Sequence, residues 1–413
     1  MKLEGLFTKK MRQFASHRRP GMTSLHKSFG ALCLLLKNCC TCPMICDSEL
    51  KLFNLSDEGT VYALQTLIDI SAAYALVHRY LSLSICVGGL LANFMHIIVL
   101  TRPVMRKCAI NRILSLMAVC DMLIMVSYII FTVRFGFAID SSNPPVGYEL
   151  GWIVFLMIHV VFSIALHTIS LYLSVVTAFI RYKALKTLSS KWMRASSACP
   201  IFLLTIIFIG FLSIPTFMVH AILYADENTS LPDAERLYTV GLSEFATVNR
   251  CFMFKINLWL TGIMFKVIPC GLLLFFTVAL LLQFNVNRRR RLEITSGKSL
   301  ASKKVELHSD RTTKMLTVLL GIFLSTELPQ GILAILNGFY PTDIHHFIYL
   351  SLGEVLDLLS LINCNACFIV YPCISSLYRD TFRKTLKSMK DSLFTKQKSA
   401  FYRLTPKESD VFL

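Results

Sequence analysis

Long apolar stretches separated by polar segments dominate the chain. A helix that crosses the hydrocarbon core of a bilayer, ~30 Å thick, needs roughly 20 predominantly apolar residues. Lipid cannot solvate the open edges of a sheet, so such stretches form helices. The sequence therefore predicts an all-α membrane protein, a seven-transmembrane helix bundle. The predicted spans are Tyr80–Leu100, Ile110–Phe135, Trp152–Ile180, Cys199–Tyr224, Ile256–Phe284, Met315–Asn337 and Phe347–Tyr371.

Composition supports the membrane assignment. Of the 413 residues, 54% are hydrophobic and 16% are charged, whereas soluble domains have ~25% charged residues. A water-soluble enzyme of this size would lack the polar residues that cover its surface. The formal net charge is +17, but the basic residues lie between the apolar stretches, which indicates membrane topology and not nucleic-acid binding.

The charge of the connecting segments predicts the orientation of the bundle. Segment 285–314 holds nine basic and three acidic residues, whereas segment 222–255 holds three basic and five acidic residues. Positively charged loops stay in the cytoplasm, so we expect the N-terminus outside and the C-terminus inside. The expected organisation is an extracellular segment 1–77, a bundle 78–372, and an amphipathic eighth helix with a cytoplasmic tail, 373–413.

The first 51 residues are basic, which disfavours export. A short apolar run, Phe29–Leu36, leaves three interpretations open: a cleaved signal, an unusual tail, or a wrongly assigned translation start. Two N-glycosylation sequons, at Asn54 and Asn228, both fall in segments predicted to lie outside. They predict a glycoprotein and agree with the orientation.

Polar side chains inside the predicted spans are candidate functional groups, because an ionised group at mid-membrane costs roughly 3 kcal/mol. Glu354 and Asp357 share one face of the seventh helix. Asn93 and Asp121 are candidates for a pair across the first two helices, and Lys266 for extension to the membrane interface. The alternative is a structural polar network between helices. The neutral polar residues in these spans include His159, His167, Asn363 and Asn365.

Two prolines interrupt the fifth and sixth spans. Pro269 and Pro329 each remove a backbone hydrogen bond, to the carbonyls of Phe265 and Ser325, and predict kinks in their helices. Because the fifth and sixth helices flank the large basic segment 285–314, the kinks indicate that part of these helices moves.

Short motifs follow one another in order, one for each of several helices. The most specific is Thr326–Gly331, which reads Thr-Glu-Leu-Pro-Gln-Gly. The set resembles rhodopsin-like G-protein-coupled receptors over roughly residues 78–390. More narrowly, it resembles invertebrate myosuppressin and FMRFamide-type peptide receptors and the nematode serpentine receptor class w. The other matching segments are Gly89–Asn93, Leu116–Asp121, Ile180–Tyr182, Leu352–Tyr371 and Tyr378–Arg383.

The resemblance implies a plasma-membrane receptor for an amidated, FMRFamide/myosuppressin-like neuropeptide, with no cofactor or metal. A carboxylate would pair with a cationic Arg of the peptide. Movement of the sixth helix would then signal to a heterotrimeric G protein, and phosphorylated tail residues would recruit arrestin. The implied ligand contacts are Glu327, Asp357, His159, His167 and Tyr349, and the implied inner switch residues are Arg181, Tyr182 and Tyr371.

The chain departs from the wider family at three places. Ile180 replaces the acid that would neutralise Arg181, and Cys367-Phe368 replaces Asn-Pro in the seventh helix. No Cys lies between Cys120 and Cys199, so the family's usual disulfide has no partner on the third helix. Two alternatives stay open for Cys251: a bond to the N-terminal cysteine cluster, or a free thiol.

Two further functions remain open at this point. One is a chemosensory receptor of the same fold for a non-peptide cue, and the other is a small transporter or channel, although no inverted repeat is visible. An enzyme is disfavoured, because no HExxH, GxSxG or Walker-type motif occurs.

Overall fold

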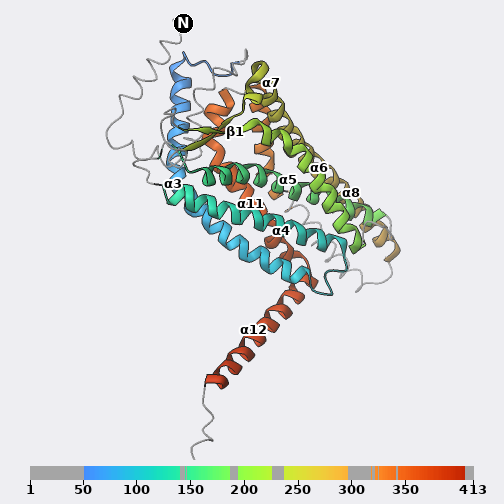
Figure 1. Ribbon diagram of the computed structural model, residues 1–413. Coiled ribbons are helices and arrows are strands. Elements are labelled where there is room, and N and C mark those ends of the chain that lie inside the picture. The colour runs from blue at the N-terminus through green and yellow to red at the C-terminus, as the bar shows by residue number, and fades with distance from the viewer. Residues whose placement is uncertain are drawn as a thin grey trace, which may run out of the picture.

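The computed structural model describes residues 51–139, 145, 147–186, 194–225, 237–295, 318, 321–323, 325–340 and 343–404. Within these residues, seven helices are long and apolar enough to cross a membrane, which confirms the predicted bundle. Figure 1 shows the bundle with α12 projecting from one end and the strand β1 at the other. The helices are α3 (Glu58–Leu100), α4 (Ala109–Phe131), α5 (Leu150–Lys186), α6 (Ala198–Val219), α7 (Glu244–Leu260), α8 (Ile268–Thr295), the sixth span (Gly321–Phe339), α11 (Leu350–Ile374) and α12 (Ser376–Leu404).

The first helix begins well before the apolar stretch that predicted it. It starts at Glu58 and not at Tyr80, because Asp57 caps it: the Asp57 carboxylate accepts hydrogen bonds from the backbone N–H of Thr60 at 2.8 Å and from its hydroxyl at 2.7 Å. These bonds lower the pKa of Asp57. Hydropathy alone did not detect the extension, since its residues are less uniformly apolar.

A β-hairpin follows the fourth span. Strands β1 (His220–Tyr224) and β2 (Tyr238–Leu242) pair antiparallel, with His220 opposite Leu242. The prediction that the fourth helix continues to Tyr224 is therefore wrong: the helix ends at Val219, and the chain becomes extended at His220. An extended apolar run and a helix cannot be separated by hydropathy.

The fifth span consists of α7, a π-helical turn (Thr261–Val267) and α8. The π-turn directly precedes Ile268-Pro269, where the proline removes a backbone donor. Near the outer end of α7, three consecutive residues, Asn249, Arg250 and Cys251, have positive φ angles of 53°, 56° and 60°. Cys251 is disulfide-bonded, and the other described cysteines are free. Its partner therefore lies outside the described residues, and the free-thiol alternative is wrong.

Two other π-helical turns occur at the ends of spans. One continues α4 over Thr132–Phe137, and the other precedes α11 over Ile344–Tyr349. A short 3-10 turn, Ala195–Ser197, leads into α6. π-turns carry one extra residue per turn and are frequent at functional sites. The turn Ile344–Tyr349 directly precedes α11, the helix that holds Glu354 and Asp357.

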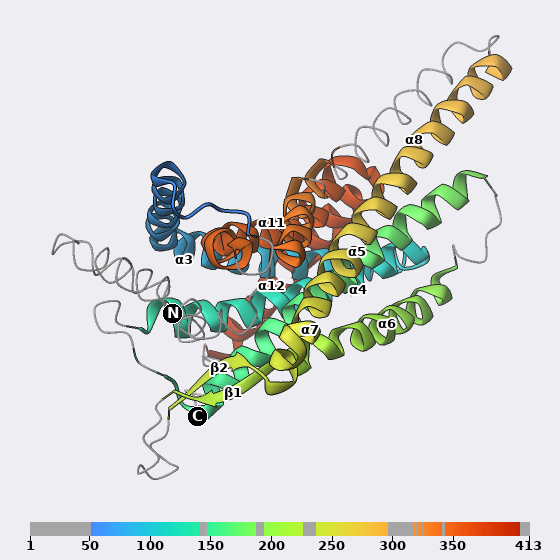
Figure 2. The same cartoon turned by 90° about the horizontal axis from the view of Figure 1, so that it is seen from above.

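The core lies between α3, α4, α5, α6 and α11. Figure 2, seen from above, places α6 at the margin of the bundle beside α5. Its outward residues Leu204 and Phe211 are 69% and 70% exposed, as expected for side chains that contact lipid. At the α3–α11 contact Gly89 allows a close approach of the two helices, because an added Cβ would overlap the Asn365 amide and force that side chain to shift.

The predicted eighth helix is present as α12. It is anchored by Tyr378, which is fully buried and whose hydroxyl lies 2.9 Å from His96 Nδ1 on α3. The ring of Tyr378 also stacks on Phe382, with centroids 6.2 Å apart. This contact fixes the start of α12 against the end of the bundle (Figure 1).

Candidate functional site

A fully buried carboxylate, Glu327, lies at the centre of the bundle with 0% of its side chain exposed. Its Oε1 accepts hydrogen bonds from His167 Nε2 at 2.8 Å and from Asn363 Nδ2 at 2.9 Å. Its Oε2 pairs with Lys266 Nζ at 2.8 Å. Charge pairing and several donors are what a buried carboxylate needs. This cluster joins α5, the π-turn of the fifth span, the sixth span and α11.

Lys266 is held on its other side by Gln330, whose Oε1 lies 2.7 Å from Nζ. The prediction that Lys266 extends to the membrane interface is therefore wrong, because Glu327 and Gln330 hold its ammonium inside the bundle. Gln330 Nε2 donates to Ser360 Oγ at 2.9 Å and to the carbonyl of Leu356 at 3.0 Å, both on α11. We call Lys266, Glu327, Gln330, His167 and Asn363 the central cluster.

The two carboxylates of α11 have different surroundings. Asp357 is exposed and Glu354 is half-buried. Tyr128 of α4 hydrogen-bonds to Asp357, whereas Glu354 Oε2 is buried without a hydrogen-bond partner. Within the part of the chain that the structure describes, neither carboxylate forms an ion pair. We call Glu354 and Asp357 the outer carboxylates, because they lie in the half of α11 predicted to face outside.

A chain of hydrogen bonds leads from α3 to the outer carboxylates. Tyr74 OH lies 3.3 Å from His78 Nδ1, and His78 Nε2 lies 3.0 Å from Tyr128 OH. One tautomer satisfies the whole chain: Tyr74 donates to Nδ1, Nε2–H donates to Tyr128, and Tyr128 donates to Asp357. The chain therefore directs the Tyr128 hydroxyl at Asp357 as a hydrogen-bond donor.

The remaining predicted ligand contacts are dispersed. His159 is buried, and its ring stacks on Phe131 and Phe155 with centroids 5.0 and 5.8 Å away. Its Nδ1 has no hydrogen-bond partner. Tyr349 is 38% exposed and stacks on His345 with centroids 5.4 Å apart. The structure thus brings His167 to Glu327, but it places His159 in an aromatic stack.

The direct pair predicted between Asn93 and Asp121 does not form. Asn93 Nδ2 donates to the carbonyls of Gly89 at 3.1 Å and Cys364 at 3.2 Å, and Asn93 Oδ1 has no partner. Asp121 Oδ1 accepts from Ser170 Oγ at 3.0 Å, and the Cys364 thiol also hydrogen-bonds to it. The two residues are joined through Cys364, which comes between them.

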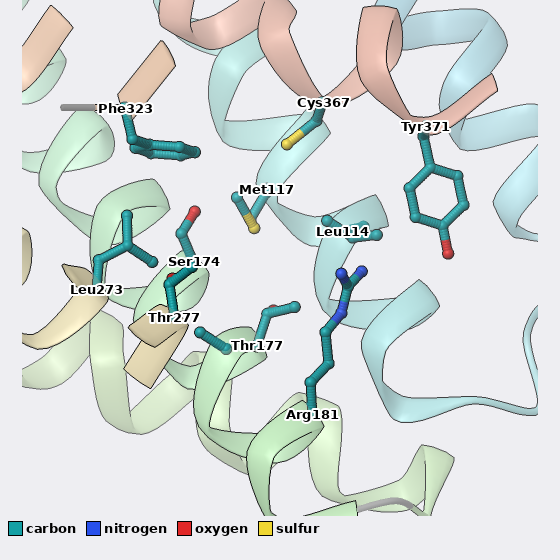
Figure 3. A pocket seen from close by; sticks show the side chains of 11 residues that line it. Leu114, Met117, Ser174, Thr177, Arg181, Leu273, Thr277, Phe323, Cys367 and Tyr371 are labelled. Carbon is teal, nitrogen blue, oxygen red and sulfur yellow. The ribbon is translucent and has the colours of Figure 1, made fainter. Parts of the chain in front are cut away.

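Two of the three predicted inner switch residues lie at a cavity at the opposite end of the bundle, shown in Figure 3. Arg181 and Tyr371 both line it. Tyr371 OH donates to Asn111 Oδ1 of α4 at 2.6 Å. Tyr182 does not line this cavity; its ring lies 6.4 Å from that of Phe276 on α8.

The predicted glycosylation and phosphorylation positions differ in their exposure. The sequon residue Asn54 is exposed, whereas Asn228 lies outside the described residues. In the tail, Thr385 is 3% exposed and therefore unsuitable as a phosphorylation site. The hydroxyl of Thr381 donates to the carbonyl of Leu377 at 2.7 Å.

Sequence reasoning missed Gln330, Tyr128 and His78 as members of these sites. Gln330 belongs to the Thr326–Gly331 motif, so its position was a usable signal. Tyrosine is common near membrane interfaces, and His78 precedes the predicted first span, so the sequence context of Tyr128 and His78 gave no indication that they meet Asp357.

Comparison with known proteins gives two matches. A family described as serpentine type 7TM GPCR chemoreceptor Srw matches residues 80–389. The chain is also similar to the G-protein coupled receptor dmsr-1 of Caenorhabditis elegans, with 30% identity over 370 residues that cover 80% of this chain and 72% of that receptor.

Proposed function

Because this chain belongs to the serpentine class w family of seven-transmembrane G-protein-coupled receptors, we propose that its extracellular ligand is an amidated neuropeptide of the FMRFamide/myosuppressin type. Family membership confirms the resemblance seen in the motifs. It makes the protein a non-enzymatic, multi-pass receptor, typically of the plasma membrane, that couples a ligand to a heterotrimeric G protein. The transporter or channel alternative is not retained.

The outer carboxylates support a cationic ligand group. Glu327 was one of the two carboxylates expected to bind it, but Lys266 already neutralises Glu327 at 2.8 Å. Asp357 is exposed, accepts a hydrogen bond from Tyr128, and has the half-buried Glu354 on the same helix face. A guanidinium has five donors that match carboxylate oxygens. We therefore assign the peptide Arg to Asp357, with Glu354 as its second partner.

The central cluster is the part of this receptor best placed to transmit the signal. Lys266 on the fifth span and Glu327 on the sixth hold these helices together, and Gln330 connects the same point to Ser360 on α11. Pro329 lies between Glu327 and Gln330, where it removes a backbone bond. A ligand that moves α11 changes the Gln330 contacts first, and this favours movement of the sixth helix about Pro329.

Arrestin binding is part of the same proposal. Phosphorylation adds a charge of about −1.5 to −2 and strong acceptors. Because Thr385 is buried and Thr381 is half-buried, we assign the phosphorylated positions to exposed or later tail residues such as Ser388 and Ser392.

The decisive test is a calcium and cAMP assay in cells that express the full chain, exposed to a library of amidated peptides. We expect a response to peptides with an Arg near the amidated C-terminus and no response to the same peptides with a free carboxylate. Silence across the library, with the receptor detected at the cell surface, would reject the peptide assignment.

A second candidate is a chemosensory receptor for a non-peptide cue. The observation in its favour is the matched family itself, whose description names chemoreceptors. Small cationic odorants in the same assay distinguish the two functions: this candidate requires a response to an odorant and none to the peptides.

A further inference from the structure

The cavity at the predicted cytoplasmic end of the bundle is not explained by the proposed ligand site. Side chains from α4, α5, α8, α11 and the sixth span surround it (Figure 3). Its volume is about 70 Å³. One water molecule needs ~10–15 Å³, whereas sites for drug-sized ligands measure ~300–1,000 Å³. The cavity therefore suits an occupant of a few heavy atoms.

The lining is apolar over most of its area. Leu114 and Met117 of α4, Leu273 of α8 and Phe323 of the sixth span all face it. Figure 3 shows Phe323 and Leu273 on one side and Leu114 on the other. An apolar lining favours a hydrocarbon body, because transfer of such a body from water contributes ~0.8 kcal/mol per buried methylene.

One cation faces this apolar space. Arg181 lies on α5, and Figure 3 shows its guanidinium directed toward Leu114. The preceding residue, Ile180, is apolar and has 0% exposure. Among the described residues, the structure gives Arg181 no hydrogen bond or ion pair. A guanidinium without a carboxylate partner beside an apolar wall attracts an anion.

A second polar group independently indicates a missing ligand. Thr177 precedes Arg181 by one helical turn, so the two side chains share a face of α5. Thr177 is 8% exposed, and its Oγ1 is buried without any hydrogen-bond partner. A buried hydroxyl without a partner costs about 1–3 kcal/mol. Ser174, by contrast, already donates to the carbonyl of Ser170 at 3.0 Å.

We propose that this cavity is a binding site for a small amphiphilic anion, a carboxylate or phosphate with a short apolar body. The anionic head pairs with Arg181 and accepts a hydrogen bond from Thr177, and the body lies against Met117 and Phe323. The head is either that of a soluble acid from the cytoplasm or that of an anionic lipid. Because Tyr371 also lines the cavity, the occupant binds between residues of the inner switch.

A cysteine in the wall provides a local probe. Cys367 of α11 lines the cavity and is free. Cys199 and Cys373 are free and exposed elsewhere, so they serve as references in the same molecule. The experiment measures the rate at which methyl methanethiosulfonate modifies each cysteine of the full chain in zwitterionic nanodiscs, with and without hexanoate. A ligand at ten times its Kd leaves about one site in ten free.

We expect hexanoate at that concentration to slow modification of Cys367 about tenfold and to leave Cys199 and Cys373 unchanged. Arg181→Gln should weaken this protection about tenfold or more, since it removes a charged hydrogen bond, and Arg181→Lys should retain part of it. Lys183→Gln is the matched control, because Lys183 is an exposed cation two residues along the same helix.

The thermal unfolding midpoint provides a second readout in every variant. It shows that Arg181→Gln is folded, and hexanoate should raise it in the wild type and in Lys183→Gln, less in Arg181→Lys, and not in Arg181→Gln. Replacing part of the zwitterionic lipid with phosphatidylglycerol tests the lipid source. Protection of Cys367 by this lipid alone, dependent on Arg181, assigns the site to a lipid head.

Three outcomes would overturn the proposal. They are equal protection by 1-hexanol, protection that is unchanged in Arg181→Gln, and the absence of both protection and a thermal shift with either anion. No agonist is used, so the outcome is independent of the neuropeptide assignment.

Discussion

The central cluster and the outer carboxylates place acidic groups in the same bundle under opposite conditions. Glu327 is fully buried and is held by Lys266, His167 and Asn363. Asp357 is exposed and Glu354 is half-buried, and neither has a cationic partner among the described residues. The comparison separates two roles that a sequence cannot distinguish: one carboxylate joins helices, and the others have capacity left to bind a ligand cation.

The largest effect is expected from Glu327→Gln. This change leaves Lys266 inside the bundle without its counter-ion, and breaking a buried pair from one side costs ~3–5 kcal/mol. We expect a marked fall in the thermal unfolding midpoint and in cell-surface expression. Glu354→Gln, which breaks no ion pair, is the matched control and should express normally.

The double variant Lys266→Met with Glu327→Leu sharpens this prediction. Replacing both charges by apolar side chains of similar volume is often neutral for stability, so surface expression should recover while signalling stays impaired. If the single Glu327→Gln variant unfolded at the wild-type temperature, the central cluster would not be the structural contact described here.

A smaller effect, on ligand response and not on stability, is expected from Asp357→Asn. The variant keeps the shape of the side chain and removes its charge. A hydrogen bond to a charged group contributes about 1.5–3 kcal/mol, so the agonist concentration for half-maximal signalling should rise about 10- to 100-fold. Surface expression, measured with an antibody to an N-terminal tag, should not change. A loss of expression with unchanged potency would contradict this assignment, because it would give Asp357 a structural role and not a ligand-binding role.

The connection between α3 and the outer carboxylates predicts an intermediate effect for Tyr128→Phe. This change removes the hydroxyl that links His78 to Asp357. A single hydrogen bond contributes about 1 kcal/mol, which corresponds to roughly a fivefold loss of potency. His159→Phe, in the neighbouring aromatic stack, is the control, because it retains a ring without removing this link.

The smallest effect is expected from Ser360→Ala, which removes one acceptor of Gln330 at the edge of the central cluster. Gln330 keeps its bonds to the carbonyls of Leu356 and Thr326, so the free energy of unfolding should fall by about 0.5–1.5 kcal/mol. Agonist potency should stay within twofold of the wild type, roughly the effect of a 0.4 kcal/mol change. A larger loss of potency than in Tyr128→Phe would place ligand contacts deeper in the bundle.

The sequence predicted the fold better than the site, for physical reasons. Apolar length identifies a membrane helix directly, so the number and order of the spans were readable. The limits of the spans were not, because a cap at Asp57 and an extended run after Val219 leave no mark in hydropathy. The candidate carboxylates were also readable from the sequence, because an ionised side chain inside the membrane is unfavourable in free energy and is therefore a functional candidate.

Pairing between helices was not predictable from the sequence. The direction in which Lys266 points depends on the π-turn that contains it and on the rotation of the sixth span. The predicted pair of Asn93 with Asp121 failed because Cys364 lies between them. Spacing along one helix fixes which side chains share a face, but not what stands opposite that face.

The central claim is that Asp357 binds the cation of the ligand, and one measurement tests it most directly. An active amidated peptide and its analogue with citrulline in place of Arg are compared on the wild type and on Asp357→Asn, as a double-mutant cycle. The account predicts that citrulline lowers potency on the wild type and has little further effect on Asp357→Asn. Additive losses, with citrulline as harmful on Asp357→Asn as on the wild type, would contradict it.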